Sequence, residues 1–343
     1  MHVDVMTGPR PLAQMQQFAK DAQQAGFSGM VITEGSRTAY LSCAVAALAA
    51  PGLDILTGVA VSFPRSPMVT AQVAWELAEA SGGHFRLGLG TQVRTHVVRR
   101  YGSEFEHPGP RLRDHVEAIR ACFRAFRGEE PLDYHGRFVE LTFLNRQWSP
   151  GPIDAPDPPV DIAAVNPWML RMAGAVADGV HIHPLGHPGY LRDTALPNLE
   201  AGAAAAGRSG PRPTVIAPVL TIVGDTEAER AKFRDAVRAQ LSFYGSTPNY
   251  AFILEAAGFP ELTGRLRERQ KAGDISGMAD LVDDDVLAVF ATEASWDGLA
   301  DALRSRYAGL ADHLVMYLGG PAWDRDREAF ERFGSVARAL AAG

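Results

Sequence analysis

The segment from Ile55 to Gln92 constrains the fold of this chain more than any other part of the sequence. It begins and ends with short apolar runs, Ile55–Val61 and Phe85–Thr91, whose length is typical of buried strands. Between them, Ser66-Pro67 is typical of a helix start and Gly82-Gly83 of a helix end. Two strands joined by one helix through such short connections form a right-handed crossover between parallel neighbours. Enzymes built from such units carry their chemistry at the carboxyl ends of the strands.

The same alternation of strands and helices continues along the whole chain. Helical patterns separate eight strand-like runs, which are His2–Met6, Gly29–Thr33, Ile55–Val61, Phe85–Thr91, Pro159–Val165, Gly179–His183, Thr214–Val223 and His313–Leu318. Eight strands alternating with helices predict an α/β fold, a (β/α)8 TIM barrel. Long insertions follow strands 4 and 7; a hairpin is expected at Tyr134–Phe138 in the first, and the second is a helical insertion over about 243–293. No shift in composition divides the sequence, so we expect a single domain over residues 1–343.

Composition and charge exclude several classes of protein. The 343 residues are 46% hydrophobic and 21% charged, which suits a large core, and a net charge of −7 predicts no nucleic-acid partner. We expect a cytoplasmic protein without a membrane partner, because the sequence has no run of eighteen apolar residues and no basic and apolar leader after Met1. Cys43 and Cys122 fall on predicted helices and are expected to be reduced core thiols.

Several motifs are similar to those of one known family. They are Leu56–Val61 with Arg65–Pro67, Ser81–Thr91, Asp161–Pro167 with Ala177–Gly179, and Phe243–Pro248. In these motifs the chain resembles the bacterial luciferase-like flavin and deazaflavin oxidoreductases, specifically their coenzyme F420-dependent branch. The resemblance implies an enzyme that transfers a hydride between the deazaflavin C5 and a small organic substrate. An FMN-dependent monooxygenase of the same superfamily is the alternative. The resemblance also implies a homodimer.

The resemblance further implies which residues hold the cofactor. A bulge at Gly58, Val59 and Ala60, with a non-prolyl cis peptide near Val59–Ala60, would press on one face of the ring. The alternative is an ordinary buried strand whose glycine eases packing.

The end of the fourth strand, at Gly90, Thr91 and Gln92, would let the ring approach closely and would offer it hydrogen bonds. The glycines of Gly88-Leu89-Gly90 also suggest a dinucleotide fingerprint, but Val93 occupies the position of its third glycine.

A third cofactor segment is expected after the fifth strand. Ala164, Val165 and Asn166 lead into a helix, and free N–H groups at a helix start attract phosphate. By resemblance this turn, with His183 at the end of the sixth strand, would receive the phosphate-bearing tail of the cofactor. Asn166 could equally be a plain N-cap.

Glu34 is the candidate catalytic residue, because it is an acid at the end of the second strand. It could exchange a proton beside the ring or position the substrate, or it could instead be bonded to a neighbouring arginine or to backbone. Many members of the family carry a histidine directly after this acid, whereas this chain has Gly35. A second departure is His84, where the family usually has arginine.

Two other chemistries remain open. His181 and His183 share one face of a strand, and a metal-dependent barrel hydrolase is a further alternative, although no carboxylate cluster accompanies the pair and we expect no metal. A barrel that binds the cofactor without turnover is a third possibility.

Among the arginines at positions 86, 94, 99, 100, 111 and 113, only Arg94 is expected to contact the acidic tail of F420.

Overall fold

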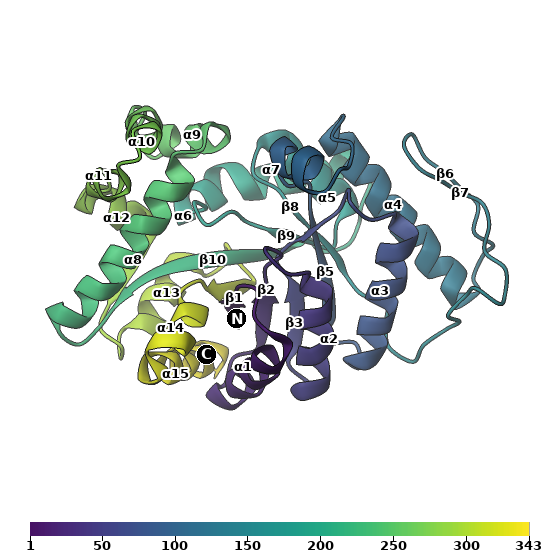
Figure 1. Ribbon diagram of the computed structural model, residues 1–343, viewed down its shortest axis with the longest axis horizontal. Coiled ribbons are helices and arrows are strands. Elements are labelled where there is room, and N and C mark those ends of the chain that lie inside the picture. Colours follow the sequence, from purple (N-terminus) through teal and green to yellow (C-terminus); the bar gives the residue numbers. More distant parts are fainter. Residues whose placement is uncertain (343) are drawn as a thin grey trace.

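Eight parallel strands close into a barrel in the computed structural model, which describes residues 1–342 (Figure 1). In order around the ring, the strands are β1 (His2–Thr7), β2 (Gly29–Ile32), β3 (Asp54–Thr57), β5 (Phe85–Gly90), β8 (Val160–Ala163), β9 (Gly179–His181), β10 (Thr214–Val223) and β12 (His313–Met316). The ring closes where β12 pairs with β1, in a register that aligns His2 with His313. The predicted (β/α)8 barrel is confirmed, and each of the eight predicted strands is present.

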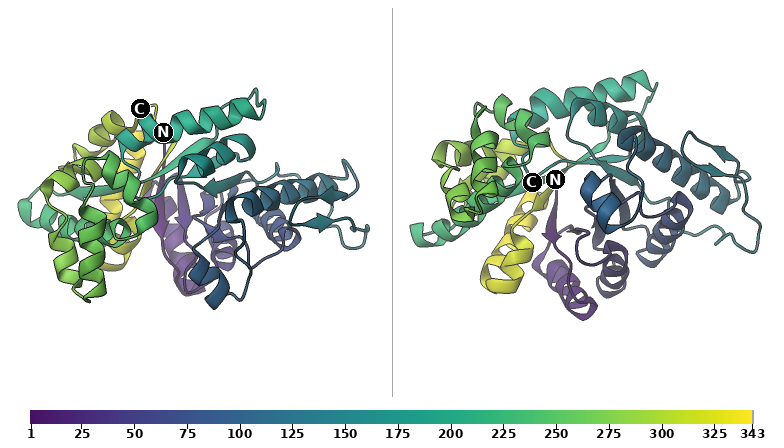
Figure 2. Two further views of the ribbon diagram at one scale, coloured as in Figure 1. Left: turned by 90° about the horizontal axis from the view of Figure 1, so that it is seen from above. Right: turned by 45° about the horizontal axis from the view of Figure 1, so that its top comes forward.

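Helices cover the outside of the barrel. They are α1 (Leu12–Ala25), α2 (Ala39–Ala49), α3 (Pro67–Ala80), α4 (Pro108–Arg127), α5 (Pro167–Val176), α6 (Pro188–Tyr190), α7 (Leu196–Ala205), α8 (Glu227–Gly245), α13 (Leu299–Tyr307), α14 (Gly319–Arg325) and α15 (Arg327–Ala342). A five-residue π-helical stretch, Leu191–Ala195, joins α6 to α7. Ser66 caps α3 through a hydrogen bond from the Val69 N–H, as the sequence predicted. The last helix packs beside the first strand and first helix (Figure 2).

Two excursions leave the barrel on opposite sides (Figures 1 and 2). After β5 come a π-helical turn, η1 (His96–Arg100), then α4 and a hairpin of β6 (Tyr134–His135) and β7 (Glu140–Leu141). The second excursion follows α8 and contains η3 (Pro248–Tyr250), α9 (Ala251–Ala256), α10 (Leu262–Lys271), α11 (Ile275–Asp280) and α12 (Asp284–Phe290). It ends in β11 (Ala291–Ala294), which extends the sheet by pairing with the second half of β10. The sequence did not predict β11, because its four residues lack a strand pattern of their own.

The amino-terminal half of the barrel interior is polar. Asp4 and His313 are joined by a hydrogen bond of 2.8 Å, and Arg86 binds Asp161 through two bonds of 2.6 and 2.8 Å. Burial disfavours a charged imidazole at His313, but the hydrogen bond to Asp4 and the negative charge of Asp4 together outweigh burial and raise the pKa of His313. The Asp4–His313 and Arg86–Asp161 pairs place opposite charges together inside the barrel. The opposite, carboxyl end of the strands is where a barrel enzyme carries its chemistry.

No helix within residues 1–342 combines the length and the apolar character needed to span a bilayer.

Candidate functional site

The carboxyl ends of the strands form one mouth, and alternation along each strand decides which side chains face it. Val31, Leu56, Ile216 and Val315 form an apolar cluster separate from the main core, which identifies these positions as facing the barrel interior. Since side chains alternate, the residue two positions further along a strand faces the same way. Gly58 therefore follows Leu56 to the mouth, and Tyr317 follows Val315.

Gly58 and Gly90 have no side chains of their own at the ends of two neighbouring strands, and the side chains of Val31 and Val59 pack against them. A Cβ at Gly90 would lie 2.6 Å from Val59 Cγ2, too close for any larger residue without movement. The peptide between Gly58 and Val59 is cis, one bond earlier than the position implied by resemblance near Val59–Ala60. It separates β3 from β4 (Ala60–Val61), a short strand that pairs with the end of β5. The backbone bulge predicted here is present.

Thr91 and Gln92 continue from β5 over the mouth. Gln92 has a φ of +56°, and its side-chain oxygen accepts a hydrogen bond of 2.9 Å from the Val93 N–H. The Thr91 hydroxyl donates to the Gln92 carbonyl at 3.2 Å. Both polar side chains thus bind local backbone in this structure, and Gln92 remains exposed.

The turn from β8 into α5 presents a capped helix N-terminus. Asn166 Oδ1 accepts a hydrogen bond of 2.9 Å from the Met169 N–H, and Pro167 is the first helical residue. Ala164 is buried, while the Val165 carbonyl accepts a hydrogen bond from the hydroxyl of Tyr190. Both interpretations of this turn stay compatible, because a capped helix start still carries the positive end of the helix dipole.

A cluster of aromatic rings surrounds His183, directly after β9. Its ring centroid lies 4.0 Å from that of Tyr250 and 4.7 Å from that of Tyr244. Burial lowers the pKa of His183 to about 3, so the ring is neutral near pH 7. The hydroxyls of Tyr244 and Tyr317 are 2.7 Å apart, and that of Tyr317 also donates to Gln240 at 2.9 Å. Of this cluster, the sequence analysis named only His183 as a candidate site residue. Tyr317 could have been found as well, because it lies two residues after the inward-facing Val315.

His181 and His183 do not assemble a metal site. Within residues 1–342 no group of three or more histidine, cysteine, aspartate or glutamate side chains could hold a metal ion. The buried Nε2 of His181 has no hydrogen-bond partner and lies 4.0 Å from Asp161 Oδ2, which already binds Arg86. Burial lowers the pKa of His181 to about 3. The donor set of a metal-dependent hydrolase is therefore not brought together at this pair.

Glu34, directly after Thr33 at the end of β2, is held in an ion pair. Its side chain is only 2% exposed, and its two carboxylate oxygens accept bonds of 2.5 and 2.9 Å from Arg65. Of the two interpretations left open by the sequence, this geometry is that of a carboxylate bonded to an arginine. Arg65 belonged to a family motif, but nothing in the sequence paired it with Glu34.

The arginines that the sequence grouped together are dispersed in the structure. Arg86 lies in the polar interior described above, not at the mouth. Arg94 is exposed and pairs with Glu106 at 3.0 Å, while Arg111 pairs with Glu104. A contact between Arg94 and a cofactor tail would therefore compete with an existing surface ion pair.

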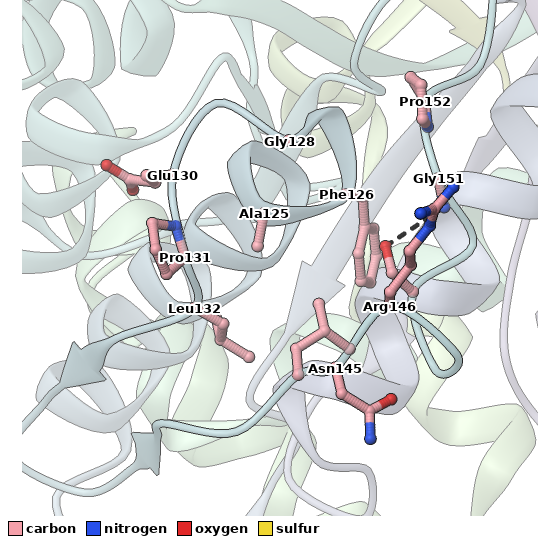
Figure 3. Close-up of a pocket in the computed structure, with 12 residues that line it drawn as sticks. Ala125, Phe126, Gly128, Glu130, Pro131, Leu132, Asn145, Arg146, Gly151 and Pro152 are labelled. Atoms are coloured by element: carbon pink, nitrogen blue, oxygen red, sulfur yellow. Dashed lines mark hydrogen bonds between the residues drawn. The ribbon is translucent and has the colours of Figure 1, made fainter.

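Two pockets lie elsewhere on the molecule. One, of about 460 Å³, is bounded by the end of α4 and by the segments on both sides of the β6–β7 hairpin, and none of its lining residues belongs to a barrel strand (Figure 3). The other, of about 540 Å³, includes Arg86, Val160 and Thr214 at the amino ends of their strands. Neither coincides with the mouth, to which the sequence assigned the cofactor.

Comparison with known proteins decides the family. A sequence model described as "Luciferase-like monooxygenase" matches residues 1–313. The chain belongs to this luciferase-like family. Family membership makes it an oxidoreductase, as the sequence predicted.

Two relatives of this luciferase-like protein cover nearly its whole length. An uncharacterised protein of Mycobacterium tuberculosis is 36% identical over 307 residues, which is 90% of each chain. The 5,10-methylenetetrahydromethanopterin reductase of Archaeoglobus fulgidus is 28% identical over 300 residues, or 85% of each chain.

Two solved structures share the fold of the luciferase-like barrel. The coenzyme F420-dependent tetrahydromethanopterin reductase of Methanopyrus kandleri has a TM-score of 0.79 at 20% identity, with 97% of both chains covered. A type II Baeyer–Villiger monooxygenase of Pseudomonas putida, in complex with FMN, has a TM-score of 0.67 at 14% identity and covers 100% of this chain and 98% of its own.

The departure at His84 lies at the amino end of the barrel, directly before β5. His84 Nδ1 is 2.8 Å from Asp54 Oδ1, at the amino end of β3. The other departure, Gly35 after Glu34, is at the mouth, so the absent histidine concerns the site itself.

Proposed function

We propose that this protein is an F420-dependent oxidoreductase that transfers a hydride between the deazaflavin C5 and a small organic substrate. The observation that carries the proposal is the sector at Gly58, Val59 and Gly90, where a partly exposed backbone bulge packs against the end of β5, next to the strand that leads into α5. A flat ring fits against the partly exposed bulge, and an anionic tail fits the helix start. The F420-dependent reductase of Methanopyrus kandleri and the motifs that resemble the F420-dependent branch favour a deazaflavin as that ring.

Each candidate residue has a defined part in this proposal. Gly58, Val59 and Ala60 support one face of the ring, while Gly90 lets the ring approach β5 closely. Thr91 and Gln92 would exchange their local hydrogen bonds for bonds to the ring, which costs little because both bonds are near the surface.

The tail of the cofactor is assigned to the ends of β8 and β9, the next strands of the barrel after β5. The phosphate would bind at Ala164, Val165 and Asn166, where the Trp168 N–H is the first-turn donor, because Pro167 has no N–H and that of Met169 is bound to Asn166. The neutral ring of His183 would flank the tail. When bound, the deazaflavin supplies or accepts the hydride; the chain positions the reactants and excludes water.

An FMN-dependent monooxygenase is the second candidate. It is favoured by the family's description and by the FMN-bound Baeyer–Villiger enzyme that shares the fold. The same backbone sector would support a flavin ring, and FMN also carries a phosphate for the α5 N-terminus.

Titration of the purified protein with F420 and with FMN tests both candidates. Quenching of tryptophan fluorescence is a suitable signal, because Trp168 lies half exposed in the first turn of α5. We expect saturable binding of F420 at micromolar concentration and weaker binding of FMN. Tight binding of FMN alone would favour the monooxygenase, and both candidates fail if neither compound binds at micromolar concentration.

A homodimer remains a proposal. Leu41 and Leu48 lie two turns apart on α2, and their side chains are 58% and 72% exposed, which leaves an apolar stripe for a second copy to cover. Light scattering after size exclusion measures the mass in solution; a monomer at micromolar concentration would contradict this proposal.

A further inference from the structure

The carboxylate of Glu34 does more than neutralise Arg65. Its Oε2 also accepts a hydrogen bond of 2.7 Å from the Val61 N–H. Oε2 thus receives two donors and Oε1 one, from a side chain that is 2% exposed. A carboxylate so fully engaged is suited to holding its neighbours in place, and poorly suited to exchanging protons with a substrate.

Arg65 completes the arrangement from the loop between β4 and α3. One of its nitrogens donates to the Val61 carbonyl at 2.9 Å and to Glu34, and the other donates to Glu34 and to Thr38. Its guanidinium lies 4.9 Å from the ring centroid of Tyr40. Arg65 is therefore fixed by contacts on several sides, and its loop is fixed with it.

Both backbone groups of Val61 are thus bound by side chains of one ion pair. On the other side of β4, Val61 pairs with Gly90, and the Ser62 N–H donates to the Gly90 carbonyl at 3.0 Å. Within residues 1–342, β5 is the only strand that pairs with β4. The ion pair therefore takes the place of the missing strand, since buried backbone groups require partners.

We propose that Glu34 and Arg65 act together as a clamp that positions the bulge of Gly58, Val59 and Ala60 against the cofactor ring. This inference rests on the proposed function, because it assigns the bulge to ring binding. The acid at the end of β2 is then a positioning residue. Its contribution is to the affinity and orientation of the cofactor.

A double-mutant cycle on F420 affinity tests the clamp without knowledge of the substrate. The variants are Glu34→Ala, Arg65→Ala and the double variant, titrated as above. Hydrogen bonds to charged groups contribute enough that each single change should weaken F420 binding by about tenfold or more. Because the two residues act as a unit, the effects of the single changes should not add. The Kd of the double variant for F420 should be at most about threefold higher than that of whichever single variant binds F420 more weakly.

Two further variants separate positioning from general loss of structure. Glu34→Gln keeps an acceptor for the Val61 N–H and should restore part of the affinity. Asp312→Ala is the matched control, because Asp312 binds Arg212 at 2.6 and 3.1 Å and accepts from the Val215 N–H at 2.8 Å, at the amino end of the barrel. It should lower the melting temperature and leave the Kd for F420 within about twofold.

The outcomes distinguish this inference from the proposed function. Absence of F420 binding by the unaltered protein refutes the proposed function. If that protein binds F420, the clamp is refuted by a Glu34→Ala variant whose Kd is unchanged, by additive single effects, or by an equal loss in Asp312→Ala. A Glu34→Gln variant that binds F420 no better than Glu34→Ala also contradicts it.

Discussion

The substitution Asn166→Asp isolates the proposed phosphate site from the stability of the helix that forms it. Asparagine and aspartate are equally good N-caps, so the bond from the Met169 N–H should persist and α5 should remain intact. The change adds one negative charge at the helix start, where we propose that the cofactor phosphate binds.

The size of the effect follows from Coulomb's law. A phosphate on the first-turn N–H groups would lie roughly 5 Å from the capping side chain, so one added charge costs about 3 kcal/mol at an effective dielectric constant of ~20. Asn166 is exposed, and screening at ~0.15 M salt leaves roughly 1–2 kcal/mol of this repulsion. At 1.4 kcal/mol per tenfold change, the Kd should rise by about five- to thirtyfold.

Fluorescence titration at low and high salt measures this change. The matched control is Asn145→Asp, because Asn145 Oδ1 likewise accepts a backbone bond, from the Gln147 N–H at 3.1 Å, on an exposed loop beyond β7. The control should bind the cofactor as the unaltered protein does. A Kd that Asn166→Asp leaves unchanged at low salt, or a loss that does not shrink as salt is added, would refute a phosphate at α5.

Further predictions concern the barrel itself. Gly88→Ala should destabilise the fold by about 3 kcal/mol or more, because its Cβ would overlap the Thr57 carbonyl oxygen and lie 2.6 Å from His181 Nε2. Gly264→Ala should stabilise the fold by about 0.5–1 kcal/mol, because its Cβ would have open space around it in α10. Urea unfolding measures both changes, and similar free energies of unfolding for the two variants would contradict the packing described for Gly88. The folded-state pKa values of His181 and His183 are lowered to about 3, so the unfolded chain binds protons first as the pH falls. Stability should therefore decrease from about pH 6.5 downwards, and a His183→Asn variant should show a shallower decrease by up to one proton; an unchanged slope would count against a neutral buried ring.

The fold could be predicted from sequence because its signals are local and repeated. Each barrel strand is a short apolar run of its own, and each turn carries its glycine or proline. The elements that sequence reasoning missed have no such signal. Strand β11 exists because the long β10 offers a free edge to Ala291–Ala294. Helix α14 is a short segment that begins at Gly319, directly after the last strand-like run, and Asp326 separates it from α15.

The site was predictable where backbone decides it and unpredictable where distant side chains meet. Gly58 and Gly90 could be placed at the mouth from their motifs. The bond between Tyr317 and Gln240 joins residues 77 positions apart, and no periodicity relates them. For the same reason the sequence could offer an arginine partner for Glu34 only as one of two alternatives.

Arg86 shows that one long-range pair was within reach of sequence reasoning. On strand β5, Arg86, Gly88 and Gly90 alternate with Phe85, Leu87 and Leu89, so the arginine must share the inward face of the two glycines. A buried guanidinium requires a carboxylate. Asp161 lies on β8, the neighbouring strand, where it pairs with Gly88 on the same inward face and is flanked by the apolar Val160 and Ile162. Alternation and charge together therefore predict this pair, and they remove Arg86 from any basic surface at the mouth.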